Sequence, residues 1–422
     1  MQPGAWTQRG SEHAEAGLPL EEARRRILAE LAPVSGSERV PLATSLGRVL
    51  AEDVHAAVSV PPHDNAAMDG YAVRSADLPA EGAAELHLAG RVLAGERWES
   101  ELSPGSCLRI MTGAPLPPGA DAVVVQERAE AVDAAHVRLP GGVAPGENVR
   151  GAGDDLAAGA VALGAGCRLR PQEVGVIGSV GRAEVTVHRR PLVVFLATGD
   201  ELCSPGEPLA PGQIYDSNRP LVVAALRRLG VDVQDRGVVG DDPATLEAIL
   251  HEVGGYADAV ITTGGVSVGE ADHVKAALDA VGDVALWRIA LRPGRPLAFG
   301  WVGQAAFFGL PGNPVSAAVS LYKLVQPGLR RLMGERGDLT PMRIPAWTAE
   351  PLRKRPGRAE FQRGILEHGP DGVARVTSTG SQSSGVLTSL VHANCLIYLE
   401  PDRGHVAAGE TVYVQPLEGV QL

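Results

Sequence analysis

The middle of the chain, residues 191–338, alternates short apolar runs with segments that have helical spacing. The runs LVVFLA (192–197) and DAVITTGG (258–265) are typical of buried strands, whereas PLVVAALRRLG (220–230) and PATLEAILHEV (243–253) are typical of helices. Such alternation predicts a mostly parallel sheet with helices on both faces. Ligands of such sheets bind beyond the carboxyl ends of the strands. We therefore expect an α/β domain with a ligand site along one edge.

Four loops rich in glycine or aspartate follow the predicted strands. They are ATGDEL (197–202), VVGDDP (238–243), TTGGVSVGEAD (262–272) and GLPGNP (309–314). Glycine lets a backbone come close to a ligand, and helix N-termini offer unpaired N–H groups to anions. Because one topology gathers these loops on one edge, they suggest a site for a phosphorylated ligand, an oxyanion and a divalent cation.

Acidic residues in these loops are candidate metal or phosphate ligands. Magnesium usually takes one or two carboxylates together with substrate phosphates. Glu201 alone is explained as a solvated turn residue, and Asp272 alone as an acid in a first helical turn; their joint placement favours the metal or phosphate role. Of Asp241 and Asp242, one is explained as a helix cap, and Asp241 stays open as a second acidic contributor. Asp216 is interpreted as a turn-former.

Two arginines flank a rigid turn at Pro293-Gly294. Arg292 and Arg295 suit a tetrahedral oxyanion because a guanidinium donates several N–H bonds in a fixed fork. The alternative is an exposed hairpin with ordinary surface arginines, but the Gly-rich loop that follows favours a site. A further basic cluster surrounds Arg363, which composition alone assigns to a solvated basic face, and Ser384 lies in a Ser/Gly loop.

The regions on either side of residues 191–338 lack this alternation of strands and helices. PLEEARRRILAEL (19–31) predicts a helix, with acids in its first turn and Pro33 as a stop. Between residues 51 and 149, β-prone runs are broken by Gly or Pro every few residues, which predicts a β-rich domain. Residues 339–422 also read as all-β. Residues 1–17 are interpreted as a mobile tail.

Composition excludes several classes of protein. A net charge of −12 argues against general binding to nucleic acids or membranes, since neither polyanion attracts such a surface. The four scattered cysteines form no CxxC pair and predict free thiols in a reducing cytoplasm. The N-terminus lacks the apolar core of a signal peptide, and no stretch approaches a membrane span. We expect a cytoplasmic protein.

Seven motifs carry a resemblance to a known family. In order they are HDNAAMDGYAVR, RIMTGAPLP, ATGDEL, YDSNRP, TTGGVSVGEAD, LRPGRPLAFG and GLPGNPVSA. The series closely resembles that of the molybdopterin molybdenumtransferases, the MoeA family, which includes the E domain of gephyrin. The resemblance implies an elongated dimerisation domain (18–50 and 150–190), an inserted β-rich domain (51–149), a molybdopterin-binding α/β domain (191–338) and a C-terminal β-barrel (339–422).

The resemblance also implies an activity and its residues. Family members insert molybdenum from molybdate into adenylylated molybdopterin and release AMP with the help of Mg²⁺. By motif, the implied catalytic acids are Asp272, Glu201, Asp241 and Asp64, with Glu201 and Asp272 holding the magnesium. The implied substrate-binding residues are Thr112, Arg288, Arg292, Arg295, Arg363 and Ser384. A homodimer is implied, with Asp64 and Thr112 reaching across its interface, as is contact with the molybdopterin adenylyltransferase.

One departure and two rival functions remain. The family commonly has lysines where this chain has LRPGRP; arginine keeps the charge but sheds a proton less readily. Only three lysines occur, at positions 275, 323 and 354, so we interpret the change as compositional. The rivals are adenylyl transfer to molybdopterin, carried out by relatives of the α/β domain alone, and a non-catalytic scaffold of the same fold.

Overall fold

The structure is a computed structural model that describes residues 17–264, 277–278 and 280–417. The chain forms two compact units. The smaller unit comprises Arg39–Leu46 and Leu50–Thr186, and the larger comprises the rest of the chain. The chain crosses from one unit to the other within β1 (Ser37–Pro41) and β12 (Glu184–His188).

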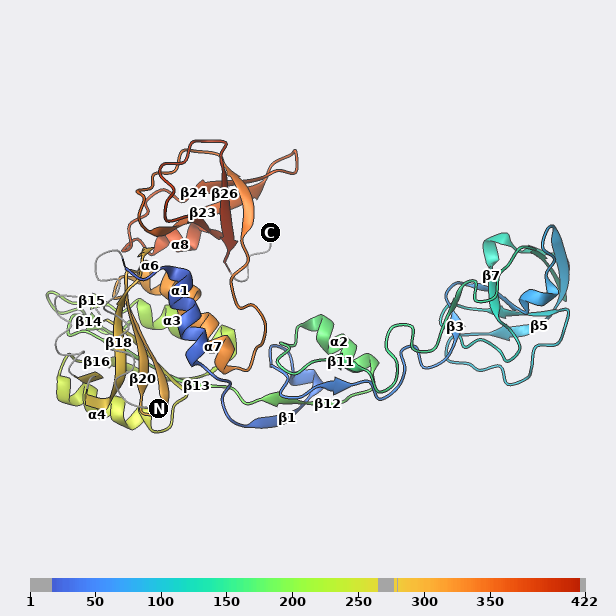
Figure 1. The fold of residues 1–422 in the computed structure, drawn as a ribbon, viewed down its shortest axis with the longest axis horizontal. Helices are drawn as coiled ribbons and strands as arrows, with labels where there is room; N and C mark the ends of the chain where they lie inside the picture. Colours follow the sequence, from blue (N-terminus) through green and yellow to red (C-terminus); the bar gives the residue numbers. More distant parts are fainter. Residues whose placement is uncertain (1–16, 265–276, 279, 418–422) are drawn as a thin grey trace. The chain divides into compact units, whose positions relative to one another are not determined.

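A six-stranded sheet forms the centre of the larger unit (Figure 1). Its order is β16 (Asp232–Val239), β13 (Leu192–Thr198), β17 (Ala259–Thr263), β21 (Ala305–Leu310), β20 (Pro296–Val302) and β18 (Gly282–Arg288). The first four strands run parallel, and β20 is antiparallel to both of its neighbours. The mostly parallel sheet predicted from the sequence is confirmed.

Helices cover both faces of this sheet, as predicted. The helices α1 (Leu20–Glu30), α3 (Asn218–Leu229), α6 (Pro314–Ser320) and α7 (Gln326–Leu332) share one apolar core, and α4 (Pro243–Gly254) contributes to the other. Strand β13 supplies both cores, because successive side chains of a strand point to opposite faces. Val193 and Phe195 enter the first core, and Val194 and Leu196 enter the second. The helix predicted from about Glu270 lies largely outside the described residues.

The helix after GLPGNP is longer than the sequence predicts. The pattern of NPVSAAVSLYKLV (313–325) predicts a helix that ends at Val325. Instead α6 passes into a π-helical turn, η5 (Leu321–Val325), and α7 continues to Leu332. A proline lacks the N–H that an α-helix requires and crowds the preceding turn. The π-helical turn directly before Pro327 changes the carbonyl pairing, so this proline begins a helical segment instead of ending one.

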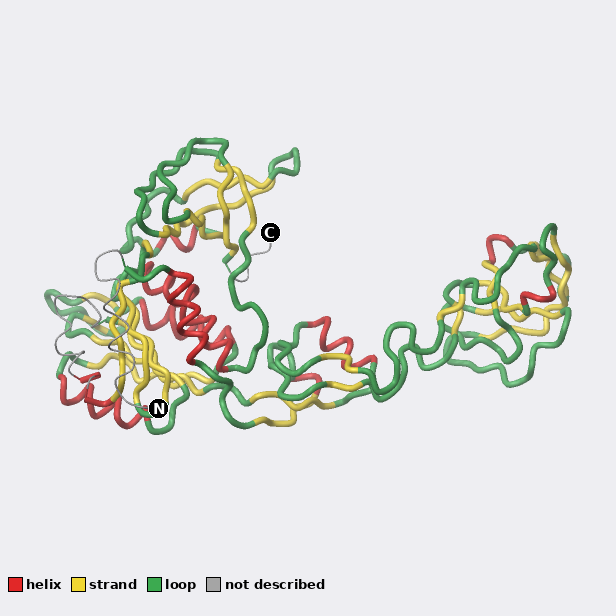
Figure 2. Tube along the Cα trace, viewed as in Figure 1, coloured by secondary structure: helices red, strands yellow, loops and turns green. Residues whose placement is uncertain are grey.

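The C-terminal part of the larger unit is a closed five-stranded barrel, drawn mostly as yellow strands and green loops in Figure 2. The strands are β22 (Ile344–Thr348), β23 (Ala359–His368), β24 (Ala374–Ser378), β25 (Cys395–Leu399) and β26 (Thr411–Pro416). Strand β23 pairs with both β24 and β25, which closes the ring. The predicted β-barrel is confirmed, although we missed β22, whose IPAWT sequence carries a proline that disfavours strands.

The barrel joins the α/β part through the turn at Pro293-Gly294. Strand β19 (Leu291–Arg292) runs parallel to the start of β23, with Leu291 level with Ala359 and Arg292 level with Glu360. On the other side, the backbone N–H of Val315 donates to the carbonyl of Ser384 at 3.1 Å. Both arginines of the turn therefore lie beside the barrel.

The smaller unit is rich in strands, as expected. Its main sheet has the order β7 (Ala122–Val125), β4 (Gly70–Val73), β6 (Ser106–Ile110), β5 (Ala83–Val92), β9 (His136–Pro140) and β8 (Glu130–Ala131). The short helix α2 (Pro171–Ser179) begins with a capping box. Its Glu173 accepts from the backbone N–H of Arg170 at 2.9 Å, and the hydrogen bond from the Arg170 side chain lowers the Glu173 pKa to about 2.

All four cysteines fall in the described ranges and are free thiols, three of them buried. Within the part of the chain that the structure describes, no helix has the length and apolar character needed to cross a membrane.

Candidate functional site

The carboxyl ends of the four parallel strands are level with one another. Thr198 pairs with Val239 at the ends of β13 and β16, and Thr263 pairs with Leu310 at the ends of β17 and β21. The Thr198 hydroxyl also donates to the Thr263 carbonyl at 3.3 Å. The loops that begin at these strand ends are therefore neighbours, as predicted from the topology. Of TTGGVSVGEAD, only the first three residues are described.

Acidic side chains lie on two of these loops. Glu201 is exposed directly after β13, and Asp241 is exposed directly after β16. The loops are tied together, because the Asp241 N–H donates to Asp200 Oδ1 at 3.0 Å and the Asp200 N–H donates to Asp241 Oδ2 at 3.4 Å. Asp242 caps α4 through Thr245, whose hydroxyl lowers the Asp242 pKa. The cap is thus Asp242, and Asp241 faces the neighbouring loop.

Asp272, which the sequence singles out with Glu201, lies outside the described residues. Asp200 was missed, although its place beside Glu201 in GDEL was a usable signal. Among the described residues no group of three or more His, Cys, Asp or Glu could hold a metal ion by itself. Glu201 with the Asp200–Asp241 pair offers oxygen donors alone, which fits Mg²⁺ sharing its coordination with a phosphate.

Several buried polar atoms gather at the same edge. Asp216 Oδ1 accepts from the N–H groups of Asn218 and Arg219, each at 3.0 Å, while its Oδ2 is buried and has no partner among the described residues. The hydroxyls of Thr262 and Thr263 are also buried and have no hydrogen-bond partner among the described residues. Buried polar groups in native proteins are nearly always hydrogen-bonded. Three such atoms therefore lie at the edge where the loops meet.

The turn at Pro293-Gly294 packs closely on α6. Gly294 has φ +101°, and a Cβ there would lie 2.7 Å from Ser320 Oγ, so the turn depends on glycine. Arg292 and Arg295 flank it with exposed side chains, and Arg288 is exposed at the end of β18, where it pairs with Pro296. The structure thus brings the three predicted arginines to one hairpin, on the edge where the loops meet.

Arg363 is buried, with 1% of its surface exposed. Its Nε donates to Ser389 Oγ at 2.9 Å, and its Nη2 donates to the carbonyls of Ser381 and Ser383 at 3.2 and 3.1 Å. None of the ion pairs within the described ranges involves Arg363. Burial lowers its pKa to about 10; the charge of Glu360 opposes this shift, and the charge of Arg292 adds to it. The interpretation of Arg363 as part of a solvated basic face is wrong.

Glu360 is the carboxylate nearest to these arginines, and we missed it. It lies 3.6 Å from Arg292 and also accepts from Gln362 Nε2 at 2.9 Å. One carboxylate between two guanidinium groups leaves a local excess of positive charge. Ser384 sits on the loop whose carbonyls bind Arg363, and its own carbonyl accepts from Val315 at the start of α6.

The remaining candidates, Asp64 and Thr112, belong to the smaller unit and lie on adjacent segments there. Asp64 Oδ1 accepts from the Ala152 N–H at 2.8 Å. Thr112 donates both its N–H and its hydroxyl to Asp69 Oδ1, each at 2.7 Å. These two hydrogen bonds lower the pKa of Asp69. Asp69, in the HDNAAMDGYAVR motif, is a further acid that we did not single out.

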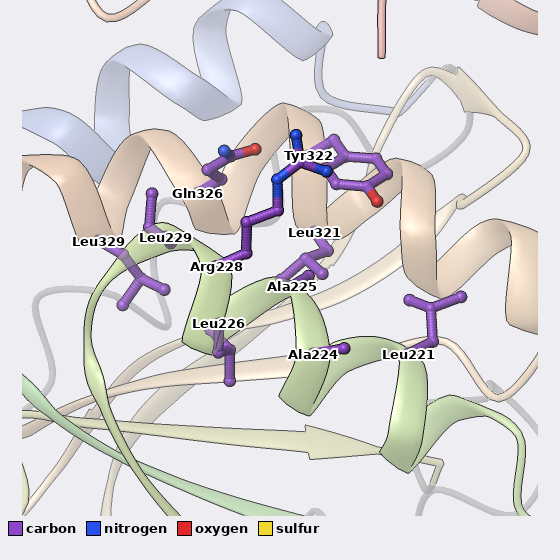
Figure 3. Close-up of a pocket in the computed structure, with 10 residues that line it drawn as sticks. All are labelled: Leu221, Ala224, Ala225, Leu226, Arg228, Leu229, Leu321, Tyr322, Gln326 and Leu329. Atoms are coloured by element: carbon purple, nitrogen blue, oxygen red, sulfur yellow. The ribbon is translucent and has the colours of Figure 1, made fainter. Parts of the chain in front are cut away.

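Two cavities of the larger unit differ in chemistry. One, of about 630 Å³, lies against the barrel and is lined by charged and polar side chains that include Arg292 and Glu360. The other, of about 290 Å³, lies between α3 and the η5–α7 segment, and Figure 3 shows leucines and alanines along it. Of the described residues that line it, none is a carboxylate. The cavity against the barrel, with its charged and polar lining, is the better suited of the two to an anionic ligand.

The fold and these side chains define a class of protein: an α/β domain with a polar edge at the carboxyl ends of its strands, joined to a β-barrel and to a strand-rich unit. Three protein-family models match this chain. They are the MoeA N-terminal region (domains I and II) at residues 18–181, a probable molybdopterin-binding domain at 194–331, and the MoeA C-terminal region (domain IV) at 345–417.

Relatives that match nearly the whole chain point to the same family. A molybdopterin molybdenumtransferase of Haemophilus influenzae is 42% identical over 399 residues, covering 94% of this chain and 98% of the relative. Molybdopterin molybdenumtransferase 2 of Mycobacterium tuberculosis is 39% identical over 403 residues, covering 93% and 98%. A crystal structure of the molybdopterin biosynthesis protein moeA of Pyrococcus horikoshii superposes with a TM-score of 0.81 at 28% identity, covering 95% of this chain and all of that one. The chain belongs to the MoeA family and is an enzyme of molybdenum cofactor biosynthesis.

Proposed function

We propose that this enzyme inserts molybdenum from molybdate into adenylylated molybdopterin and releases AMP, with Mg²⁺ and as a homodimer. The observation that supports it most is Arg363, a buried guanidinium beside Arg292 that makes no ion pair within the described residues. A buried charge is costly unless it is paired. A bound oxyanion such as molybdate supplies the missing negative charge.

The separation of acids and arginines supports a long ligand. Glu201 follows β13, and the arginine-bearing turn precedes β20, three strands away in the sheet. Neighbouring strands lie about 4.8 Å apart, so the two groups are about 14 Å from each other. An adenylylated pterin can extend over that distance, with its phosphates near the acids and its dithiolene near the arginines.

The chain's own residues have separate tasks in this proposal. Glu201 and Asp241 hold the phosphate-bound metal, together with Asp272 as the family pattern implies. When bound, Mg²⁺ polarises the phosphoanhydride so that AMP can leave. Arg292, Arg295 and Arg363 orient molybdate beside the dithiolene and stabilise its negative charge in a partly enclosed site.

The test is AMP release in a purified reaction with adenylylated molybdopterin, molybdate and Mg²⁺. Glu201→Gln should slow release by at least about 100-fold, since even outer-shell changes at metal sites cost 10–100-fold. Glu247→Gln, an exposed acid on α4, is the matched control and should turn over normally. We expect Asp272→Asn to behave like Glu201→Gln. Normal turnover in both site variants would contradict the proposal.

The rivals give different results in the same assays. An adenylyltransferase would form adenylylated molybdopterin from ATP and molybdopterin, and a scaffold would neither turn over nor gain thermal stability with molybdate. The homodimer is tested by light scattering of the purified chain, where a monomeric mass at micromolar concentration would contradict it. Asp64→Asn and Thr112→Val test the implied role of the smaller unit, and AMP release should fall in each.

A further inference from the structure

The barrel-side cavity contains two arginines that the proposed function does not use. Arg353 and Arg355 both line this cavity of about 630 Å³, next to Arg292 of the hairpin. Neither takes part in any ion pair that the structure describes within residues 17–264, 277–278 and 280–417. Guanidinium groups that line a cavity without a carboxylate partner are well placed to bind an anion.

A buried lysine fixes the segment that carries them. Lys354 is 2% exposed, and its ammonium group donates to the carbonyls of Arg355, Pro401 and Arg403 at 3.2, 3.1 and 2.9 Å. Because Lys354 points into the barrel, its neighbours Arg353 and Arg355 point outward, where they line the cavity. The two guanidinium groups are thus carried on an anchored segment, which lowers the entropy lost on binding.

The two carboxylates of the cavity already have hydrogen-bond or ion-pair partners, and His405 can add a hydrogen-bond donor. Glu350 accepts from the Ser378 N–H at 2.7 Å, and Glu360 is engaged by Gln362 and Arg292. His405 Nδ1 accepts from the Lys354 N–H at 3.2 Å, so the neutral ring carries its proton on Nε2, a further donor.

The charge and shape of the cavity define the ligand class. Three arginines, Arg292, Arg353 and Arg355, line the cavity together with two carboxylates, Glu350 and Glu360, on a chain whose net charge is −12. The lining contains no Phe, Tyr or Trp among the described residues, so it offers no stacking surface for a pterin or an adenine. Hydrogen-bond donors and positive charge favour a compact anion over a ring system.

We propose that Arg353 and Arg355 form a second anion subsite on the barrel, which binds a tetrahedral dianion next to Arg292. The dianion is either the free metal oxyanion or the phosphate group of the pterin substrate. This choice rests on the proposed function, whereas anion binding itself rests only on the cavity. Lys354 is the positioning residue of the subsite.

The test measures binding to the full-length protein at an ionic strength of about 0.15 M, where exposed charges are screened beyond about 8 Å, with molybdate by equilibrium dialysis and inorganic phosphate by calorimetric titration. The variant is R353Q/R355Q, and the control is R227Q/R336Q, which removes two charges from exposed arginines outside the cavity lining. The Kd for at least one anion should rise by about tenfold or more in the variant, as expected for lost charge-assisted hydrogen bonds. The control should change it by less than about twofold, because exposed distant charges are screened. Equal thermal midpoints would show that both variants fold.

The outcomes separate the sources of the anion. Weaker binding of molybdate alone assigns the subsite to the metal oxyanion, and weaker binding of phosphate alone assigns it to the substrate phosphate; loss of both supports a general dianion subsite. The proposal is overturned if R353Q/R355Q binds both anions as the wild type does, or is weakened only as much as the control. Failure of the wild type to release AMP would refute the proposed function and leave these binding results standing.

Discussion

Replacing Arg363 by methionine should weaken molybdate binding by at least about tenfold while costing the free protein less stability than the loss of a buried side chain of this size normally does. Arg363 is among the largest fully buried side chains of the described chain, and a buried side chain of that size normally contributes much to stability. The expectation differs here because its charge is buried without an ion pair among the described residues. Phe361, two residues earlier on β23 and fully buried, is the matched control.

The expected magnitude follows from three contributions. Burial lowers the Arg363 pKa from 12.5 to about 10, a penalty of about 3 kcal/mol on the charged form that methionine removes. A buried methionine adds about 2 kcal/mol of apolar burial. Against these gains, three hydrogen bonds are lost, each contributing about 1.5–3 kcal/mol for a charged donor. These contributions sum to between a gain of about 0.5 and a loss of about 4 kcal/mol, with a central value of about 2 kcal/mol lost, whereas Phe361→Ala should lose about 3–5 kcal/mol.

The assay combines urea unfolding, followed by circular dichroism, with equilibrium dialysis against molybdate. Arg363→Met should unfold at a urea concentration between those of the wild type and Phe361→Ala, and it should bind molybdate at least about tenfold more weakly than the wild type. Phe361→Ala should unfold much earlier but still bind molybdate below its transition. The reasoning is refuted if Arg363→Met loses as much stability as Phe361→Ala, or if it keeps wild-type affinity for molybdate.

Three further predictions follow from single contacts. Gly294→Ala should lower the thermal midpoint and weaken molybdate binding in dialysis, since its Cβ would meet Ser320 Oγ at 2.7 Å and its φ of +101° strains any other residue. Lys354→Met should cost about 3 kcal/mol in urea unfolding, because three carbonyls lose their donor; an unchanged midpoint would show that the anchor is dispensable. Glu173→Gln should lower the thermal midpoint at pH 6. Because the folded pKa of Glu173 is depressed to about 2 from 4.5, that difference should shrink as the pH falls from about 4.5 towards 2, and a constant difference would contradict the linkage.

The central fold was predictable because its sequence pattern and its packing agree. Strands β13, β17 and β21 of the parallel part are buried on both faces, which produces continuous apolar runs such as LVVFLA between helical segments, whereas the edge strand β16 is only partly buried. The convergence of the Glu201 and Asp241 loops followed from topology alone. The π-helical turn before Pro327 was not predictable in this way, because it depends on carbonyl pairing that a residue pattern does not encode.

The burial of Arg363 escaped prediction for a physical reason. Residues 359–364 of β23 are all buried, because the strand is covered by the barrel interior on one face and by the α/β part on the other. If one face of β23 is assumed to contact solvent, the polar residues Glu360, Gln362 and Arg363 are predicted to be exposed on that face. Knowing that both faces are covered reverses the interpretation, because polar residues in a doubly buried strand need partners or a ligand.

The two described lysines bear on the arginines of the hairpin. Lys354 fits its ammonium among three carbonyls, and Lys323, which is 4% exposed, donates to Gln415 and lies over the Phe361 ring. Both positions need a compact point charge that a planar guanidinium would overfill. In a chain with so few lysines, these two remain where arginine does not fit. Arg292 and Arg295 stand at exposed positions that tolerate the larger group, and a guanidinium stays protonated. The hairpin therefore acts through fixed positive charge and hydrogen-bond donation, and a proton required by the reaction must come from another group.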